Sequence, residues 1–548
     1  MLTKLANFYK SNFNLILVLL FIALGVLAWH NRFIQDDAFI SFRYADNFVR
    51  GYGLVWNEGE RVEGYTNFLW TIIISLALLL KLEPIKFVMV VGLFLFELTL
   101  FFIYRLAASL FHSPHLALLT LLLLGTNYSF SSYATGGLET ELQTCLFAAC
   151  LWLFLTSDKG GWSMTRLALL SLLAALAMMT RLDSLLVVGL VLGSTLIKIG
   201  RQRKDGSRFW LPLSMAIGPL VLLVGSWLIW KMNFYGSVLP NTFYVKVTSL
   251  SSLKRGVIYV YLFFYSYWLV FFPFLFLGFV NRLRHRNNQS WLILAVVIVI
   301  WLSYIIAVAG DFMEFRFIVP VLPYMFLVIV WLTCKQLTRL RLKIALVLLV
   351  LCGSLHHWLT FSSPPLRYYD VDSFAGLSAF LYYERNDWIR IGHVLGESFQ
   401  HDPNVTIAVT ASGAIPYYSR LKTIDILGLN DRWVARHGEI PMSRPGHQRR
   451  ATLPYLLERK VNLLIGHPQL VPLETPANLP WHDYYFYVKV TQQDLPADSR
   501  IIEIPINSKY KMHVLYLVRS PVVDEAIRRN GWVSFAPFPT NESQPVPQ

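Results

Sequence analysis

Long apolar segments fill the first two thirds of the chain and constrain its fold more than any other feature. Runs of roughly 17–25 residues, the length that crosses a bilayer, recur up to about Thr360. Only 15% of the residues are charged, whereas a soluble domain has about 25%. Hydropathy gives twelve candidate segments, at 13–29, 66–81, 86–110, 115–131, 139–157, 164–180, 183–199, 209–231, 257–280, 291–309, 317–336 and 340–360. We therefore expect an α-helical polytopic membrane domain over residues 1–360.

Basic clusters between these segments predict how the chain is oriented. The clusters at 198–208, 282–286 and 335–343 are expected in the cytoplasm, because short cytoplasmic loops are rich in Lys and Arg. This rule also explains the net charge of +15 without nucleic-acid binding. The last segment then runs outward, and Lys4 and Lys10 keep the N-terminus inside. An inside start and an outside end require an odd number of crossings, so we expect about eleven.

The segment at 66–81 is the weakest of the twelve. Its roughly 16 residues span about 24 Å as a helix, which is shorter than a hydrocarbon core of about 30 Å. We predict that it is a re-entrant or interfacial helix. The first outer loop would then be 30–66, and residues 361–548 would form an extracytoplasmic domain.

The C-terminal residues read as a soluble mixed α/β domain. Strand-like runs occur at 405–410, 422–428, 461–466, 501–506 and 512–518. An amphipathic helix is expected near 451–460, and strands that alternate with helices indicate a layered α/β fold.

The first outer loop carries an adjacent acid pair, Asp36 and Asp37. Neighbouring residues point in different directions, so one carboxylate would face a reaction centre while the other holds structure or a cation. A lone Asp can act as a general base on a sugar hydroxyl. The alternative is a helix cap, because Asp37 precedes a run with apolar residues at helical spacing. Both roles can hold together.

Three arginines lie in outer stretches and are candidates for binding the phosphate of a donor: Arg43, Arg181 and Arg316. The guanidinium fork suits phosphate oxygens. Arg43 can also pair with the acids, and an arginine at a membrane boundary can also reach the headgroups without binding any ligand.

Polar residues of the same stretches are candidates for substrate binding: Tyr44, Glu63, Asn67, Glu139, Asn241, Lys246 and Asp311. Four of them have an ordinary alternative. Glu139 can complement a helix dipole, residues 239–246 can form an aromatic interface belt, and residues 310–316 can form a local salt-bridged turn.

Several familiar catalytic motifs do not occur in the sequence. It has no P-loop, GxSxG elbow, HExxH motif or Cys/His metal array. We therefore predict no dedicated metal site and no cytoplasmic nucleotide site. A transfer reaction on the outer face would need a lipid-linked donor.

The outer stretches resemble a known group of enzymes. The run DDAFISFRYADNFVRGYGLVWNEGERVEGYTNFLW, followed by GLET, LPNTFYVK and GDFMEFRFIVP, is similar to membrane glycosyltransferases of the GT-C superfamily. The nearest match is the terminal arabinofuranosyltransferase (AftB-like) family, whose outer domain also resembles AIPYYSRLKTIDILGLND. The resemblance spans roughly residues 30–430.

This resemblance implies a polyprenyl-phosphate sugar donor, inversion at the anomeric carbon and a base on Asp36 or Asp37, of which we favour Asp36. A divalent cation (Mg²⁺, Mn²⁺ or Ca²⁺) is compatible with an acid pair near a phosphate, although no ligand set requires one. The implied protein is a bacterial inner-membrane enzyme with its C-terminal domain in the periplasm. It would move a sugar, for example arabinofuranose, to a cell-envelope glycan.

Other functions also fit the sequence. Lipid A and a protein are alternative acceptors, and an alternative function is a transporter or flippase of a lipid-linked sugar. Transporters often carry internal repeats, which we do not find in this chain.

Overall fold

The computed structural model describes residues 12–156, 162–201, 210–245, 250–284, 288–360, 369–383, 385–441, 444–476, 487–490 and 494–537. Contacts divide the chain into two compact units. Unit 1 comprises residues 1–34, 66–238 and 248–375, and unit 2 comprises residues 35–65, 239–247 and 376–548. The first outer loop therefore groups with the C-terminal residues, which the predicted boundary at 360/361 did not anticipate.

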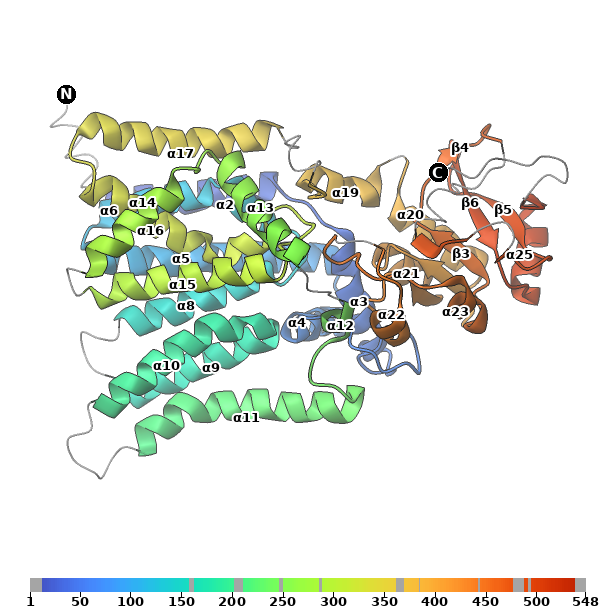
Figure 1. The fold of residues 1–548 in the computed structure, drawn as a ribbon, viewed down its shortest axis with the longest axis horizontal. Helices are drawn as coiled ribbons and strands as arrows, with labels where there is room; N and C mark the ends of the chain where they lie inside the picture. The colour runs from blue at the N-terminus through green and yellow to red at the C-terminus, as the bar shows by residue number, and fades with distance from the viewer. Residues whose placement is uncertain are drawn as a thin grey trace. The chain divides into compact units, whose positions relative to one another are not determined.

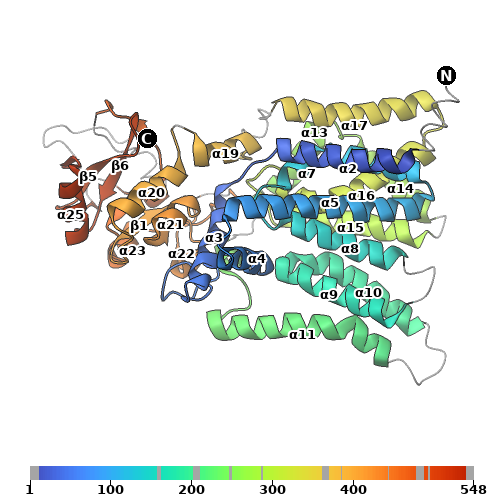
Figure 2. The same cartoon turned by 180° about the vertical axis from the view of Figure 1, so that it is seen from behind.

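Unit 1 is helical (Figures 1 and 2). Its helices are α2 (Phe13–His30), α4 (Phe68–Leu79), α5 (Pro84–Phe111), α6 (Pro114–Gly125), α7 (Tyr128–Tyr133), α8 (Thr140–Thr156), α9 (Met164–Thr180), α10 (Leu185–Arg201), α11 (Trp210–Tyr235), α13 (Leu250–Ser266), α14 (Phe272–Arg284), α15 (Gln289–Ala307), α16 (Leu322–Lys335) and α17 (Leu340–Thr360), with 3-10 turns η2 (Leu182–Ser184) and η3 (Arg316–Val321). α19 (Phe374–Tyr382) begins in unit 1 and continues into unit 2.

Seven of the described helical stretches have at least 18 residues and are apolar enough to cross a membrane. The stretch Arg316–Lys335 is 94% buried, whereas Phe13–His30 is only 11% buried. On α2 the exposed side chains include Leu15, Leu19 and Ile22. Water would not tolerate so wide an apolar face, so these side chains must meet lipid. The chain is a multi-pass membrane protein.

Local signals at several helix starts agree with the sequence. Glu83 accepts hydrogen bonds from the N–H groups of Ile85 and Lys86, and Pro84 occupies the first turn of α5. Both features favour helix initiation.

α4 has only 12 residues, about 18 Å of helix, which is consistent with a segment that does not cross the membrane. The count of eleven crossings stays a prediction.

Unit 2 contains a mixed sheet, which confirms the predicted α/β domain. Its strands are β1 (Thr406–Val409), β2 (Lys422–Asp425), β3 (Leu463–Gly466), β4 (Val471–Pro472), β5 (Arg500–Pro505), β6 (Tyr510–Tyr516) and β7 (Ser534–Phe535), in the order β2-β1-β3-β6-β5-β7, with β4 also paired to β6. β1 pairs in parallel with β2 and β3, and β3 pairs antiparallel with β6.

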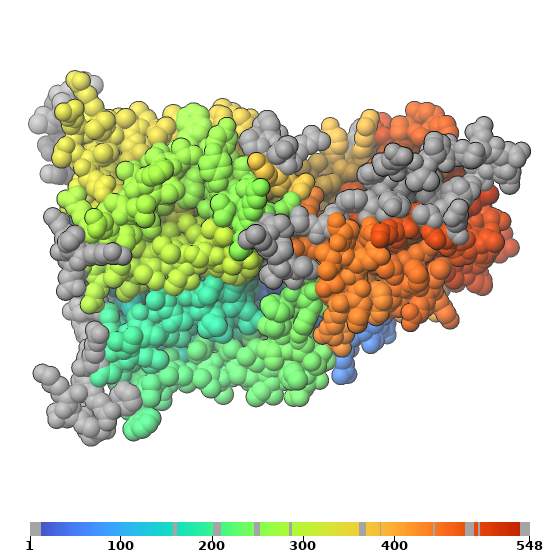
Figure 3. Space-filling view, viewed as in Figure 1, coloured from blue at the N-terminus to red at the C-terminus, as the bar shows by residue number. Residues whose placement is uncertain are grey.

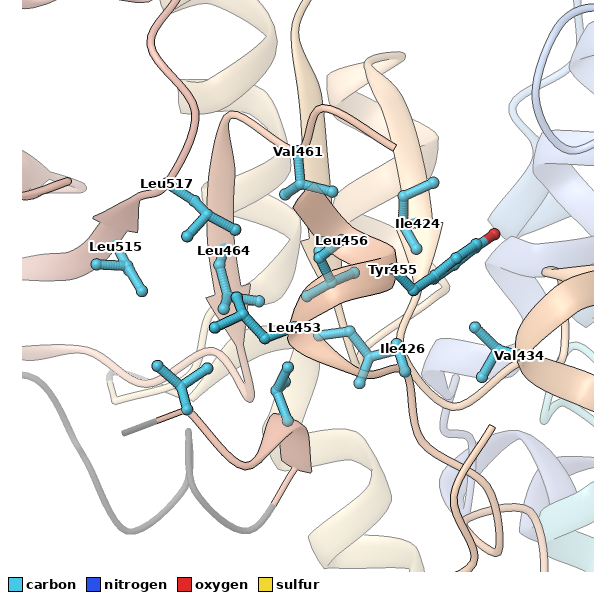
Figure 4. Packing of buried hydrophobic residues seen from close by; sticks show 14 of the residues in the cluster. Ile424, Ile426, Val434, Leu453, Tyr455, Leu456, Val461, Leu464, Leu515 and Leu517 are labelled. Atoms are coloured by element: carbon cyan, nitrogen blue, oxygen red, sulfur yellow. The ribbon is translucent and has the colours of Figure 1, made fainter. Parts of the chain in front are cut away.

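The helices of unit 2 complete its core. They are α3 (Asp36–Val49), α12 (Asn241–Val245), α20 (Trp388–Ser398), α21 (Ala414–Ser419), α22 (Arg432–His437), α23 (Leu453–Glu458) and α25 (Pro521–Asn530). Figure 4 shows side chains of α23 packed among strand residues such as Ile424, Leu464 and Leu515. β1 and β2 lead into the segments before α21 and α22, and buried polar residues lie at the end of β2 and in these two segments: Ser412, Asp425 and Asn430.

Candidate functional site

The acid pair stands at the first two positions of α3. The helix begins at Asp36, and the cap position belongs to Gln35. The alternative role of Asp37 as a helix N-cap is therefore wrong. Asp37 instead lies inside the first turn, where a negative charge favours the positive end of the helix dipole.

The carboxylate of Asp36 is fastened to the turn that follows β1. Its Oδ2 accepts a hydrogen bond from the N–H of Gly413 at 3.0 Å, and its Oδ1 accepts one from the N–H of Ala414 at 2.8 Å. Position 413 requires glycine, because a Cβ there would collide with the backbone oxygen of Asp36. The C-terminal residues of unit 2 thus fix the orientation of this carboxylate.

Burial changes the acidity of Asp36. The loss of hydration outweighs the two backbone hydrogen bonds and raises the pKa of Asp36 to about 6. A carboxylate offers about four lone-pair positions, so the two amide bonds leave room for another proton donor. Asp36 can therefore be held by the fold and still accept a proton near neutral pH.

Arg43 lies in the middle of α3 and is buried. Its Nε donates to the carbonyl of Trp56 at 2.6 Å, and its guanidinium also donates to Asn57 Oδ1 at 3.0 Å and to the carbonyl of Leu421 at 2.8 Å. A further bond reaches the carbonyl of Pro416. These bonds join the first outer loop to the C-terminal residues, which is a structural role that needs no phosphate.

Asn57 extends this connection and was missed from the sequence. Its Oδ1 also accepts the N–H of Thr423 at 3.1 Å, and its Nδ2 donates to the carbonyl of Thr423 at 2.8 Å. Asn57 thereby pairs with β2 much as a neighbouring strand would. A lone Asn in a polar loop gives no signal of a partner 366 residues away.

Three predicted substrate-binding residues lie in the same network. The hydroxyl of Tyr44 donates to the carbonyl of Val62 at 2.8 Å, and Glu63 is buried. Asn241 donates through Nδ2 to the carbonyl of Gly428 at 2.9 Å, and its N–H donates to the carbonyl of Glu63 at 2.8 Å. These contacts join α12, the first loop and residues 428–431 within unit 2, so the side chains of Tyr44 and Asn241 have a structural explanation.

A second cluster of predicted site residues lies in unit 1. Arg181 binds Glu139 at 2.7 Å and Asp183 at 2.6 Å. Asn67 donates to the second oxygen of Glu139 at 2.8 Å. Tyr304 donates to Asp183 at 2.8 Å. The cluster therefore joins α4, α8, α9 and α15 through buried polar contacts.

Asp311 and Arg316 form a further ion pair beside this cluster. Their closest atoms are 2.6 Å apart, and the guanidinium of Arg316 lies 4.9 Å from the ring centre of Phe317. Arg181 approaches the same ring to 5.2 Å. The structure therefore brings Arg181 and Arg316 together, but each is already neutralised by acidic partners.

The remaining predicted residue, Lys246, lies outside the described residues. Among the described part of the chain, no three His, Cys, Asp or Glu side chains form a group that could hold a metal ion. Asp36, Glu139 and Asp311 are each engaged by backbone N–H groups or by a guanidinium. Those three carboxylates therefore offer no ready ligand set for a divalent cation, and metal dependence stays a prediction.

Two curated relatives of this chain are named as enzymes. A family model described as a domain of unknown function (DUF8728) matches residues 379–515. The terminal beta-(1->2)-arabinofuranosyltransferase of Mycobacterium tuberculosis is 25% identical over 253 residues, 42% of this chain and 38% of the relative. The enzyme of the same name from Corynebacterium glutamicum is 27% identical over 322 residues, 53% and 46% respectively. The chain thus matches less than half the length of these relatives.

Solved structures give the fold. ArnT from Cupriavidus metallidurans, in the structure bound to undecaprenyl phosphate, aligns with a TM-score of 0.56 at 12% identity over 92% of this chain and 98% of that one. Its apo structure aligns with a TM-score of 0.53, also at 12% identity, over 91% and 97%. The protein has the fold of the GT-C membrane glycosyltransferases. The expected resemblance to GT-C enzymes and to terminal arabinofuranosyltransferases is thereby confirmed.

Within this GT-C fold, the first outer loop is more than a connector. It carries the acid pair, and its Arg43 and Asn57 bind backbone groups of α21, of Leu421 and of β2. Asn241 of α12 adds a bond to the carbonyl of Gly428. The acid pair is consequently placed by residues that follow it by more than 350 positions.

Proposed function

We propose that the chain is an inverting glycosyltransferase that moves a sugar from a polyprenyl-phosphate donor to a cell-envelope glycan. The sugar transfer would take place on the outer face of a bacterial inner membrane, with the C-terminal residues in the periplasm. The observation that carries the proposal is the carboxylate of Asp36. It is fixed by the N–H groups of Gly413 and Ala414, and its pKa is raised to about 6 by burial.

Such a carboxylate suits a general base, because a base works best when its pKa lies near the working pH. Asp36 would take the proton from an acceptor hydroxyl while the hydroxyl oxygen forms a bond to the anomeric carbon. The bond from that carbon to the phosphate oxygen breaks, and polyprenyl phosphate leaves with the electron pair. A single displacement of this kind inverts the anomeric configuration. Asp37 is the second candidate for the base.

The names of the relatives support this reaction class. Both curated relatives are arabinofuranosyltransferases, which favours arabinofuranose as the sugar. The bound lipid of the ArnT structure is undecaprenyl phosphate, which favours a polyprenyl carrier. Because the chain matches less than half of each relative's length, sugar and acceptor are both open to test, and lipid A or a protein stays an alternative acceptor.

The proposal is tested with purified full-length protein, synthetic polyprenyl-phosphoryl arabinofuranose and an arabinan oligosaccharide. The wild type should transfer the sugar, and Asp36→Asn should abolish transfer while the thermal melt stays within a few degrees. Asp46→Asn is the matched control, since Asp46 lies on the same helix and its ion pairs, with Arg50 at 3.8 Å and with Arg420 at 3.5 Å, are long.

Three other results are informative. Full activity of Asp36→Asn together with loss in Asp37→Asn would move the base by one residue. A chelator added to the wild type tests the divalent cation, which would reveal itself as activity restored by Mg²⁺, Mn²⁺ or Ca²⁺. Movement of the lipid-linked sugar across a liposome membrane without any transfer would favour a flippase and contradict the proposal.

A further inference from the structure

A cavity of about 170 Å³ lies in unit 1 beside the first half of α13. α13 contributes Lys254, Arg255 and Ile258 to one wall, and Asp311 and Tyr369 lie on others. α13 meets the end of α15 closely at Gly256, where a Cβ would collide with the backbone of Ile306. The cavity is therefore framed by a fixed helix–helix contact rather than by a surface loop alone.

The charge in this cavity is unevenly compensated. Arg255 binds the exposed Asp370 through Nη2 at 2.8 Å. Its Nη1 is buried and has no hydrogen-bond partner among the described residues. A buried N–H group without a partner costs free energy, so this position favours a ligand that accepts hydrogen bonds. Lys254, next to it, is exposed and adds a second positive charge.

Asp311 does not cancel these charges. Its carboxylate is already paired with Arg316 at 2.6 Å. Within the described residues, the ion pair recorded for these two cations is the one between Arg255 and Asp370, whose side chain is 52% exposed. A ligand with a negative charge would complete the site.

The rest of the lining is mostly apolar. α13 also contributes Tyr259 and Leu262, and Ala309 and Val371 come from other segments. Outside it, α13 shows an exposed stripe at every fourth residue, formed by Leu253, Val257, Tyr261 and Tyr265. α13 lies at the surface of unit 1 in the space-filling view (Figure 3). The cavity thus combines cations with apolar lining, and an exposed apolar stripe runs along the same helix.

The size of the cavity limits what fits inside. An engineered cavity of about 150 Å³ in another protein binds one benzene molecule, so about 170 Å³ holds a compact group such as a phosphate but not a whole lipid. The rest of an acyl or isoprenoid chain would lie along the exposed stripe of α13. The arrangement suits an amphiphile with a compact anionic head.

We infer that this cavity binds the phosphate and the first isoprenoid carbons of the polyprenyl-phosphate donor, with Lys254 and Arg255 as the phosphate ligands. The inference rests on the proposed function, because it names the site for that reaction's donor. It also assigns phosphate binding to residues other than Arg181 and Arg316, whose guanidinium groups are held by Glu139, Asp183 and Asp311.

The test measures binding without catalysis. Full-length protein in phosphatidylcholine nanodiscs is titrated with undecaprenyl phosphate, and bound lipid is counted by native mass spectrometry. We expect Lys254→Gln combined with Arg255→Gln to weaken binding by about tenfold or more, equivalent to about 1.4 kcal/mol. Ile258→Trp should weaken it similarly by filling the cavity while both charges remain.

Two controls match these variants. Lys81→Gln combined with Lys86→Gln removes two exposed charges from the same unit and should leave binding unchanged. Lys254→Arg keeps the charge and should retain most of the affinity. If the double variant Lys254→Gln and Arg255→Gln melts at a much lower temperature than the wild type, the single variants Lys254→Gln and Ile258→Trp test the lipid binding instead.

Several results would overturn the inference. One is undiminished binding of undecaprenyl phosphate in both the charge variant and Ile258→Trp. Another is equally tight binding of phosphatidylglycerol, which would indicate a general contact with anionic lipids. Displacement of the lipid by inorganic phosphate at a similar concentration would show that the apolar walls contribute nothing. Lipid binding that meets these expectations in a protein that transfers no sugar would contradict the proposed function and leave this site standing.

Discussion

Replacing Arg43 by methionine distinguishes a structural role from phosphate binding. The guanidinium donates to three backbone carbonyls, of Trp56, Pro416 and Leu421, and to the side chain of Asn57. Methionine retains much of the apolar stem and none of the donors. The substitution therefore removes one donor from each of four acceptors, in a region where Arg43 itself is only 6% exposed. Each acceptor keeps another donor, from Asn47, Arg420 or Thr423.

The size of the effect follows from these bonds. A hydrogen bond to a charged group contributes about 1.5–3 kcal/mol, so four bonds set an upper limit of roughly 6–12 kcal/mol. Two terms reduce this limit. Burial costs the guanidinium its hydration, as the lowering of the pKa of Arg43 to about 9 indicates, and water can reach some of the freed carbonyls. We expect the first loop to lose about 3 kcal/mol of local stability, a factor of roughly one hundred in its opening equilibrium.

Amide hydrogen exchange measures this opening directly. The N–H groups of Gly413, Ala414 and Thr423 are bonded to side chains of the first loop. In Arg43→Met these amides should exchange roughly one hundred times faster, whereas amides of β5 and β6 should keep their rates. Arg50→Met is the matched control, since Arg50 lies on the surface just after α3 and is 39% exposed in its ion pair with Asp46.

The structural reasoning would be refuted by one combination of results. If Arg43→Met abolished sugar transfer while exchange at Gly413, Ala414 and Thr423 stayed unchanged, the loop would not depend on Arg43. Arg43 would then act on the substrate, as a phosphate ligand does.

Two further predictions concern pH and topology. Transfer should rise with pH through a midpoint near 6, because only the deprotonated carboxylate can take a proton and burial raises the pKa of Asp36 to about 6. A pH–rate profile of the wild type measures this rise. A flat profile between pH 5 and 7 would contradict the prediction. A tag after Gln548 should be labelled by an impermeant reagent on intact spheroplasts, and labelling only after lysis would contradict the eleven-crossing topology.

Hydropathy predicted the helical membrane part well, because lipid-facing helices must be apolar along their length. It failed where a polar residue interrupts an apolar run. The predicted segment 115–131 is two helices, since Asn127 accepts the N–H of Phe130 and starts α7. The alternation of strands and helices predicted the fold class of unit 2, but not the order of its strands. The two-residue strands β4 and β7 were also missed, because so short a run carries no alternation.

The candidate site was predicted only in part, because its defining contacts are distant in sequence. The acid pair stands out in any reading of the first loop. Its partners Gly413 and Ala414 lie 377 and 378 residues after Asp36, and a small-residue turn at 411–413 gives no hint of them. For the same reason Tyr44 and Asn241 looked like substrate ligands, although their polar atoms bind the backbone of unit 2.

The arginines show why charge alone does not identify a phosphate site. Arg181 and Arg316 were candidates because a cation at a membrane boundary needs an anion, and the structure supplies that anion from Glu139 and Asp311. Lys254 and Arg255 drew no attention, although the predicted topology places them at an outer helix end, where basic residues are less common than in cytoplasmic loops. In the sequence, a better indication of a phosphate site is therefore a cation in an outer loop, whose presence the positive-inside rule does not explain. Only a structure shows whether an acidic side chain already neutralises that cation.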